Sequence, residues 1–346
     1  MPVEVYAPGK LILIGEYAVL EGAPAMVTAV ERYAVVSIEE SQTGLYTLSA
    51  PAIGINHVKF TPDPGGMPEF QVSEDRSVEQ KLQFFQTVFA RIWQAMTKEN
   101  QKALDIRIDS SAFYLSQNVK LGLGSSAAVT TALTQGLSAV WHKKLSHESL
   151  FAEALMTHHE AQGKLGSGID IAASVFGGVL SYIKKTPIPK VRNIGLSRDI
   201  IVLPVWTGYP ASTRELVNRV MELKVSRPDQ YQQIISGMSQ ISMQAVEAWA
   251  GGNTDNFLMQ IVQYEQMMNE LGELSQAPII SEVHSRIRKI VHKYDGVYKP
   301  SGAGGGDLGL AFWKAQKFSS RLENELKAEG IQPVPLSFDT RGTIIQ

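Results

Sequence analysis

The sequence predicts an α+β protein of two domains. The chain has 346 residues, which is long for a single hydrophobic core. Its composition, with 44% hydrophobic and 19% charged residues, is that of an ordinary globular protein. Strand-like and helical patterns occur on both sides of residues 186–198, a basic segment with two prolines. We therefore expect a first domain at residues 1–190 and a second at residues 191–346.

In the first half, apolar and alternating runs predict strands, and apolar residues at helical spacing predict helices. Strands are expected at residues 3–6, 11–14, 31–39, 45–48, 104–109 and 178–184, and helices at residues 79–98, 127–140 and 146–162. The strand at 45–48 is expected to pair with the one at 31–39. Helix 127–140 is mostly apolar and therefore buried, and Ser146 is the expected N-cap of the next helix. Residues 51–75, with four prolines, predict loops or short irregular strands.

The second half predicts a run of helices between strands. Strands are expected at residues 199–207, 308–312 and 333–338, and helices at residues 212–224, 228–249, 253–271, 277–294 and 315–330. No low-complexity tract or internal repeat is evident, which argues against a solenoid.

Composition narrows the classes of function. The net charge of −2 argues against nucleic-acid partners and against a polybasic membrane surface. The chain has no cysteine, so disulfides, thiolate nucleophiles and Cys-ligated metals are excluded. Neither a signal peptide nor an apolar run of membrane-spanning length is evident. These features predict a cytoplasmic enzyme or binding protein.

A glycine- and serine-rich stretch, residues 120–129, precedes the helix at 127–140. Glycine permits sharp turns and close approach of backbone to ligand, because no Cβ blocks positive φ. The serines fall at the start of the helix, where unpaired N–H groups and the helix dipole attract anions. The stretch therefore predicts a phosphate site, although an ordinary serine-capped turn has a similar composition.

The spacing within this stretch separates several kinds of nucleotide loop. It is not a P-loop, because no Gly-x-x-x-x-Gly-Lys-Ser/Thr occurs there. Gly122-x-Gly124-x-x-Ala127 matches the loose dinucleotide fingerprint, so a nucleotide-binding oxidoreductase is an alternative. The doubled serine better suits a triphosphate with magnesium, one hydroxyl serving as a metal ligand.

Other candidate residues lie near glycines. Asp170 follows Gly166 and Gly168 and is either a helix N-cap or a carboxylate that orients or deprotonates an attacking oxygen. His158 and His159 lack the zinc-protease spacing, so we expect them to be exposed or part of the core rather than metal ligands.

Charged residues and a glycine run mark two further segments. Lys10 and Glu16 flank the apolar run at 11–14, beside glycines where a ligand could approach. The run Gly302–Gly306, followed by Asp307, predicts backbone pressed against a ligand or another loop.

Together, three segments resemble the motifs of the GHMP small-molecule kinases, a family named after galacto-, homoserine, mevalonate and phosphomevalonate kinases. The segments are Ala7-Pro-Gly-Lys-x5-Glu16, Gly122-Leu-Gly-Ser-Ser-Ala-Ala128 and Ser301-Gly-Ala-Gly-Gly-Gly-Asp307. They occur in the family's order and span nearly the whole chain. Several details resemble the phosphomevalonate kinase branch: Tyr17 where mevalonate kinases tend to carry His, Lys120 before the loop, and the segments at 161–170 and 206–213.

The resemblance implies a fold and cofactors. A mixed, βαβ-containing phosphate-loop domain would precede a ferredoxin-like domain, with the active site in the cleft between them. ATP and Mg²⁺ would be the cofactors. The ATP-binding residues would be Lys120, Gly122, Leu123, Gly124, Ser125, Ser126 and Ala127. The metal ligands would be Ser126 and Glu160. In mevalonate kinases the metal-binding glutamate is separated from the catalytic aspartate by one residue more than Glu160 is from Asp170 here.

The resemblance also implies roles in catalysis and acceptor binding. Lys10 and Asp170 would be the catalytic lysine and aspartate. The acceptor-binding residues would be Glu16, Tyr17, Ser167, Ser212, Thr213, Ser301, Gly302, Ala303 and Gly304. The implied partners are ATP and a small phosphorylated acid, and the implied state is a monomer or homodimer.

The chemistry of the acceptor separates two branches of the family. A hydroxyl acceptor must lose a proton, so it needs a carboxylate base. A phosphate monoester has a second pKa of about 6 and is already anionic at neutral pH, so cations must relieve repulsion between phosphates. Lys10, Lys120 and Lys164 lie beside the glycine motifs and favour the second case. Mevalonate kinase is the near alternative. A catalytically silent relative is disfavoured by the intact catalytic residues.

Overall fold

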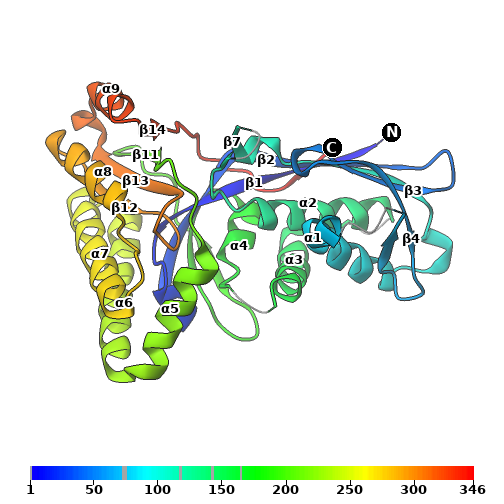
Figure 1. Cartoon of the computed structure of the whole chain (residues 1–346), viewed down its shortest axis with the longest axis horizontal. Coiled ribbons are helices and arrows are strands. Elements are labelled where there is room, and N and C mark those ends of the chain that lie inside the picture. Colours follow the sequence, from blue (N-terminus) through cyan, green and yellow to red (C-terminus); the bar gives the residue numbers. More distant parts are fainter. Residues whose placement is uncertain (1, 72–75, 117–118, 142–143, 164–165) are drawn as a thin grey trace.

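The computed structural model describes residues 2–71, 76–116, 119–141, 144–163 and 166–346. Two sheets stand beside one another, each with its own helices (Figure 1). The first has nine strands, of which seven follow the order β10-β9-β2-β6-β3-β4-β5, while β1 pairs with β2 and with β15. Its strands are β1 Val3–Ile14, β2 Pro24–Glu40, β3 Tyr46–Ala50, β4 Ile55–Pro62, β5 Pro68–Phe70, β6 Leu104–Asp109, β9 Val179–Ile183, β10 Lys190–Asn193 and β15 Ile344–Ile345.

Helices cover one face of the first sheet, as Figure 1 shows. They are α1 Arg76–Gln94, α2 Ser125–Val140, α3 His147–Ala161 and α4 Ile169–Phe176. Helix α2 lies directly against β1 and β2, and α1, α3 and α4 pack around it. Its small and apolar residues make this central position possible, because nearly all of them are buried. A short hairpin of β7 Tyr114–Ser116 and β8 Val119–Lys120 leads into α2.

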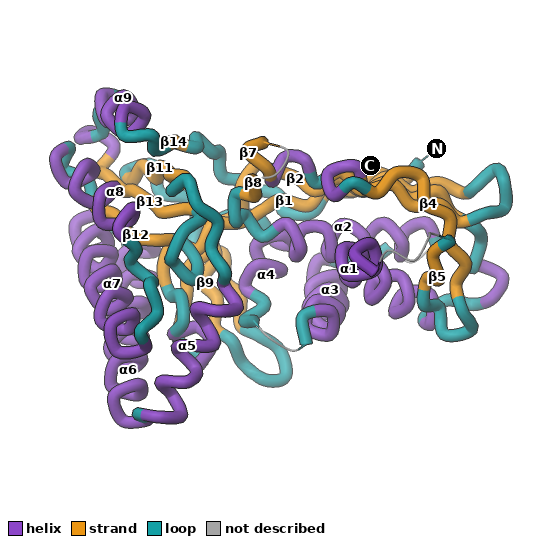
Figure 2. The backbone as a smooth tube through the Cα atoms, in the orientation of Figure 1, coloured by secondary structure: helices purple, strands orange, loops and turns teal. Residues whose placement is uncertain are grey.

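The second sheet has the strand order β12-β13-β11-β14. Its strands are β11 Ile200–Trp206, β12 Val297–Pro300, β13 Leu308–Lys314 and β14 Gln332–Pro333, and its helices are α5 Thr213–Ser226, α6 Pro228–Ala250, α7 Thr254–Ser275, α8 Glu282–Lys293 and α9 Arg321–Ala328. Strand β13 alternates: Leu308, Leu310 and Phe312 join the core with α6 and α7, while Ala311 and Trp313 join the core with α8 and α9. Figure 2 shows the α6–α7 pair at the outer edge of the molecule.

Most predicted elements are confirmed. The α+β class is correct, the strand at 104–109 is β6, and the Ser146 hydroxyl accepts a hydrogen bond from the Ser149 N–H as the N-cap of α3. In the described ranges, no helix is both long and apolar enough to cross a bilayer.

Some pairings differ from the prediction. Strand β3 was expected beside β2, but β6 lies between them and pairs parallel with β3. The local pattern shows which face of a strand is buried and leaves its neighbour undetermined, because partners are chosen by the packing of the whole sheet. The predicted helix at 277–294 begins only at Glu282, and of the strand at 333–338 only Pro333 belongs to β14.

The predicted boundary at residue 190 does not match the division of the sheets. Strand β10 begins at Lys190 and still pairs with β9 of the first sheet. The chain therefore crosses to the second sheet between Asn193 and Ile200, within the proline-containing segment named above. At the end of the chain, β15 returns to pair with β1.

A buried ion pair joins the two halves. The Lys299 ammonium on β12 donates to Glu16 Oε1 at 2.5 Å, and both side chains are almost fully buried. Tyr264 on α7 donates to the backbone carbonyl of Glu16 at 2.6 Å. Burial lowers the pKa of Lys299, and the charge of Glu16 opposes that shift. The largest hydrophobic cluster is likewise continuous from β1 to α7.

This pair makes the interface between the halves sensitive to single substitutions. Lys299→Ala leaves the Glu16 carboxylate buried without its cation, and we expect a loss of about 3–5 kcal/mol in the free energy of unfolding, measured by urea denaturation. The control is Lys102→Ala, which removes an exposed pair with Glu40 and is expected to change stability little. Equal losses in the two variants would contradict this account.

Candidate functional site

The phosphate loop, residues 120–126, connects β8 to the first turn of α2. Gly124 is the residue before the helix and has a left-handed conformation with φ of 77°. The helix has 16 residues, and its first two, Ser125 and Ser126, are half-buried. Leu123 and Ala127 are buried, so they fix the loop to the core. The free N–H groups and the positive end of α2 therefore form a site suited to an anion.

Lys10 lies against this loop. Its backbone N–H donates to the Leu123 carbonyl at 2.9 Å, and its ammonium donates to the Gly122 carbonyl at 3.3 Å. The ammonium also lies 3.9 Å from Asp170 Oδ2. A Cβ on Gly124 would come within 3.0 Å of the Lys10 side chain and 3.5 Å of the Asp170 carboxylate. The structure thus brings together five of the residues predicted to act in one site.

Asp170 lies in the first turn of α4. The N-cap position belongs to Gly168, and no side chain caps the helix, so the capping alternative for Asp170 does not hold. Its side chain is 31% exposed and faces Lys10. Burial and the charge of Asp170 both raise the pKa of Tyr182, whose hydroxyl donates to the Ser167 carbonyl at 2.5 Å. Ser167 is itself buried, with its hydroxyl accepting from the Ile169 N–H.

A histidine contacts the second serine of the loop. His158 on α3 is 4% exposed, and its Nε2 lies 3.3 Å from Ser126 Oγ. Burial lowers the pKa of His158 to about 4, while the negative charge of Asp170 opposes the shift. The prediction of a core or exposed histidine was correct about burial but missed the contact with Ser126, because no local pattern shows that α3 packs against the start of α2.

The structure does not bring Glu160 into the site. Its carboxylate is 65% exposed and lies 3.8 Å from Arg91, which also pairs with Glu153. Side chains two residues apart on a helix point in nearly opposite directions. Because His158 faces Ser126, the Glu160 side chain points away from the phosphate loop. The metal role predicted for Glu160 is therefore withdrawn.

The remaining oxygen donors fit a magnesium ion that arrives with a nucleotide. Within the described residues, no three His, Cys, Asp or Glu side chains form a metal-binding group. Magnesium keeps several waters and commonly binds through one or two carboxylates plus substrate phosphates, so a complete protein cage is not required. Among the described residues near the phosphate loop, the Ser126 hydroxyl and the Asp170 carboxylate are two oxygen donors that could contribute to such a site.

The third motif is docked onto the first. Tyr17 donates to the Ala303 carbonyl at 2.5 Å, and Ser301 donates to the Ile12 carbonyl at 3.1 Å. The Gly302 N–H donates to Glu16 Oε1 at 3.3 Å. Glu16 and Tyr17 are both buried, so they support the loop from behind instead of facing the acceptor as predicted.

Asp307 also belongs to the site, in a role that the sequence did not predict. Its carboxylate lies against Gly122, where a Cβ would approach it to 3.1 Å, and its Oδ1 accepts from the Ala211 N–H at 3.2 Å. Burial raises the pKa of Asp307, and the Ala211 N–H, Lys10 and Lys120 oppose the shift. Desolvation lowers the pKa of Lys120, and Asp307 opposes this. The phosphate loop, the third motif and the segment before α5 therefore meet at this carboxylate.

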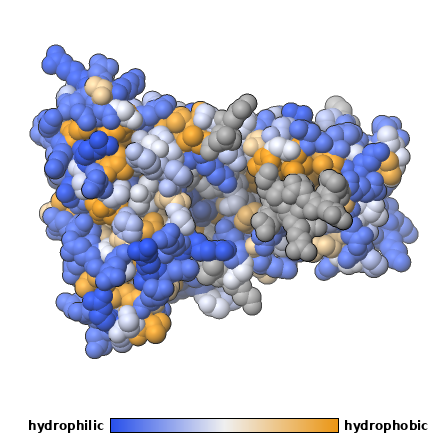
Figure 3. Space-filling view, viewed as in Figure 1, coloured by the Kyte–Doolittle hydropathy of each residue, from blue (hydrophilic) through white to orange (hydrophobic). Residues whose placement is uncertain are grey.

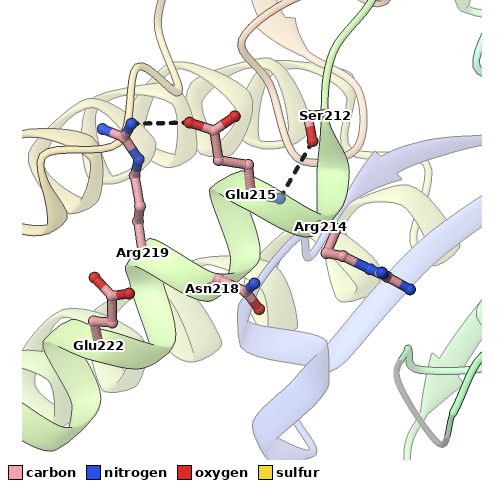
Figure 4. A pocket seen from close by; sticks show the side chains of 6 residues that line it. All are labelled: Ser212, Arg214, Glu215, Asn218, Arg219 and Glu222. Carbon is pink, nitrogen blue, oxygen red and sulfur yellow. Dashed lines mark hydrogen bonds and ion pairs between the residues drawn. The ribbon is translucent and has the colours of Figure 1, made fainter.

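The predicted acceptor residues Ser212 and Thr213 begin α5. Ser212 Oγ accepts from the Glu215 N–H as N-cap, and both residues are exposed. An open groove along α5 is lined by Ser212, Arg214, Glu215, Asn218, Arg219 and Glu222. Figure 4 shows Arg214 extending away from the Glu215–Arg219 pair, and Figure 3 shows a strongly hydrophilic surface over this helix. Lys164, also predicted near the site, lies outside the described residues.

Comparisons with known proteins find kinases of similar sequence and fold. The family described as GHMP kinases N terminal domain matches residues 86–178. A phosphomevalonate kinase of Streptomyces sp. (strain CL190) is 26% identical over 96% of each chain. A mevalonate kinase of Archaeoglobus fulgidus is 25% identical over 94% of this chain and 98% of its own. The crystal structure of Streptococcus pneumoniae phosphomevalonate kinase with phosphomevalonate and AMPPNP superposes with a TM-score of 0.80 at 20% identity, covering 98% of this chain and 99% of that one.

The close approach of Gly124 to Lys10 gives a prediction about stability. Gly124→Ala adds a Cβ in a left-handed backbone conformation and against the Lys10 side chain. Gly195→Ala is the matched control, since φ is 78° there and no atom lies within 4 Å of the added Cβ. We expect the control to lose about 1–2 kcal/mol in the free energy of unfolding, and Gly124→Ala to lose a further 1–3 kcal/mol or so through overpacking. Urea denaturation measures both, and equal losses would show that the contact with Lys10 is unimportant.

Proposed function

We propose that this chain, as a member of the GHMP kinases, transfers the γ-phosphoryl group of ATP to (R)-5-phosphomevalonate. The products would be 5-diphosphomevalonate and ADP, in a step towards isoprenoids. The observation that carries the proposal is the convergence of Lys10 and Asp170 on the phosphate loop at the start of α2. The Streptomyces relative, named phosphomevalonate kinase, and the S. pneumoniae structure, whose title names phosphomevalonate and AMPPNP, support this choice of acceptor.

The phosphate loop would hold the nucleotide. The N–H groups at the start of α2 are directed at the ligand and cost no reorganisation, because the helix fixes them. Magnesium bound with ATP would neutralise charge on the transferred group, and Ser126 and Asp170 would hold it. Gly124 leaves the space between the loop and Lys10 free of a side chain, so phosphate oxygens can approach both.

The lysines suit an anionic acceptor. Lys10 is 8% exposed, and in that partly desolvated position its charge is screened less than that of a surface lysine. Lys120, whose charge interacts with Asp307, adds a second cation beside the loop. A phosphate monoester brings about two negative charges to a triphosphate, so relief of repulsion is the main requirement. Two cations around the loop meet that requirement.

Mevalonate phosphorylation is the second candidate. The A. fulgidus relative is named mevalonate kinase and aligns over nearly all of this chain. The observation that favours this candidate is the position of Asp170, a partly exposed carboxylate 3.9 Å from Lys10, where it could accept a proton from a hydroxyl. The oxidoreductase alternative loses its basis, because the loop follows the short β7–β8 hairpin and not a strand of a parallel nucleotide-binding sheet.

One assay compares the candidates. The purified chain is supplied with Mg²⁺ and ATP, and ADP release is coupled to NADH oxidation with mevalonate, phosphomevalonate or homoserine as acceptor. We expect turnover to be fastest with phosphomevalonate. Faster turnover with mevalonate would favour the second candidate. No turnover with any acceptor, together with NAD binding in a separate titration, would overturn the kinase assignment.

Substitutions of Lys10 and Asp170 distinguish two roles for the site: relieving the repulsion between phosphates and removing a proton from the acceptor. With a phosphorylated acceptor, Lys10→Ala removes a cation that the transition state requires, and we expect kcat to fall roughly 10²–10³-fold. Asp170→Asn keeps the shape and removes a base that an anionic acceptor needs less, so its loss should be smaller. Lys102→Ala, on the exposed Glu40 pair, serves as the control with unchanged kcat. Comparable losses at the two positions, or a larger one at Asp170, would contradict the phosphate-acceptor assignment.

A further inference from the structure

We propose that His158 is a positioning residue that fixes the Ser126 hydroxyl for the magnesium-bound nucleotide. The inference rests on the proposed function, because it assumes that Ser126 faces the nucleotide and its metal. Its basis in the structure is the contact of 3.3 Å between His158 Nε2 and Ser126 Oγ, at the first turn of α2. His158 comes from α3, so the contact joins two helices that are separate in the sequence.

The imidazole is held in one orientation. It is 4% exposed, and it stacks on the half-buried ring of Phe84 from α1, with ring centroids 5.4 Å apart and planes inclined by 25°. Because both the helix and the stacking partner fix the ring plane, Nε2 has little freedom to leave Ser126. The packing of α1, α2 and α3 therefore fixes the position of the imidazole relative to Ser126.

The contact restricts the serine. A hydroxyl carries one proton and two lone pairs, and a free serine exchanges among three rotamers. The contact with the imidazole holds Ser126 in one rotamer. If Ser126 donates to Nε2, both lone pairs of Oγ stay available to a metal ion, and if Nε2 donates, one lone pair does. Groups that orient a metal ligand in this way are commonly worth 10–100-fold in metal affinity.

The other imidazole nitrogen indicates that packing alone does not explain the residue. His158 Nδ1 is buried and has no hydrogen-bond partner within the described parts of the chain. A buried polar atom without a partner lowers stability, and an apolar ring would fill the same space at lower cost. The next residue, His159, has different surroundings. Its Nε2 lies 3.5 Å from the position that a Cβ added to Gly168 would occupy. The polar contact with Ser126 is what an apolar replacement would lose.

Three substitutions separate the contact from packing. His158→Phe keeps a ring for Phe84 and removes both nitrogens. His158→Gln places an amide group near the position of Nε2 and can restore the contact. His158→Asn places its amide near the position of Nδ1, which does not face Ser126, and is the matched control. Thermal unfolding of each variant shows whether the fold is retained, and Asn replaces Phe as the test variant if the Phe variant does not fold.

The readout is nucleotide binding, measured by calorimetry with AMPPNP in the presence and absence of Mg²⁺. We expect His158→Phe and His158→Asn to raise the Kd of Mg²⁺·AMPPNP about tenfold, with little change for metal-free AMPPNP. His158→Gln should bind almost as the wild type does. In a Ser126→Ala background, His158→Phe should have no further effect, because the group through which it acts is already removed.

Three outcomes would overturn the inference. Equal weakening with and without Mg²⁺, or a full additional loss in the Ser126→Ala background, would show that His158 acts through packing. Unchanged Mg²⁺·AMPPNP affinity in the folded Phe variant would show that the contact has no role. If the wild-type chain does not bind AMPPNP at all, both the proposed function and this inference are overturned. A preference for mevalonate over phosphomevalonate leaves the inference about His158 intact, since the acceptor takes no part in this measurement.

Discussion

The buried ion pair between Glu16 and Lys299 is the constraint on which the arrangement of the site depends. Two charges removed from water stay together only if each satisfies the other, so the turn after β1 and the end of β12 cannot separate without a large cost. Glu16 also accepts from the Gly302 N–H, and Tyr17 beside it donates to Ala303. The first and third glycine segments are thereby fixed to one another.

The chemistry of the site follows from that fixed geometry. Since β1 is held at its end, Lys10 in its middle lies against the phosphate loop, where its N–H meets Leu123 and its ammonium meets the Gly122 carbonyl. Asp307, at the end of the third segment, also lies against Gly122. The positive charge of the lysines and of the start of α2 is partly balanced by the nearby carboxylates of Asp170 and Asp307. Such a balance suits a ligand with several negative charges.

Sequence reasoning succeeded where the determinant is local. The Ser146 N-cap, the strand at 104–109 and the buried helix after the Gly-Ser stretch follow from residue type and spacing within a few positions. It failed where the determinant is a distant partner. The place of β6 between β2 and β3 and the return of β15 to β1 both depend on contacts across the whole first sheet. Glu160 was misplaced because its spacing from Asp170 says nothing about which side of α3 faces the loop, and its exposed pairing with Arg91 is visible only in three dimensions.

The α+β class, the loop at the start of α2 and the resemblance to the GHMP kinases can all be read from the sequence, because the backbone of a phosphate site requires glycines and small polar residues at fixed spacing. The support of a loop by Glu16 and Tyr17, the contact of His158 with Ser126 and the place of Asp307 among the lysines are visible only in three dimensions. A side chain's role depends on its burial and on the partner it meets. Both are set by how helices and strands distant in sequence pack together.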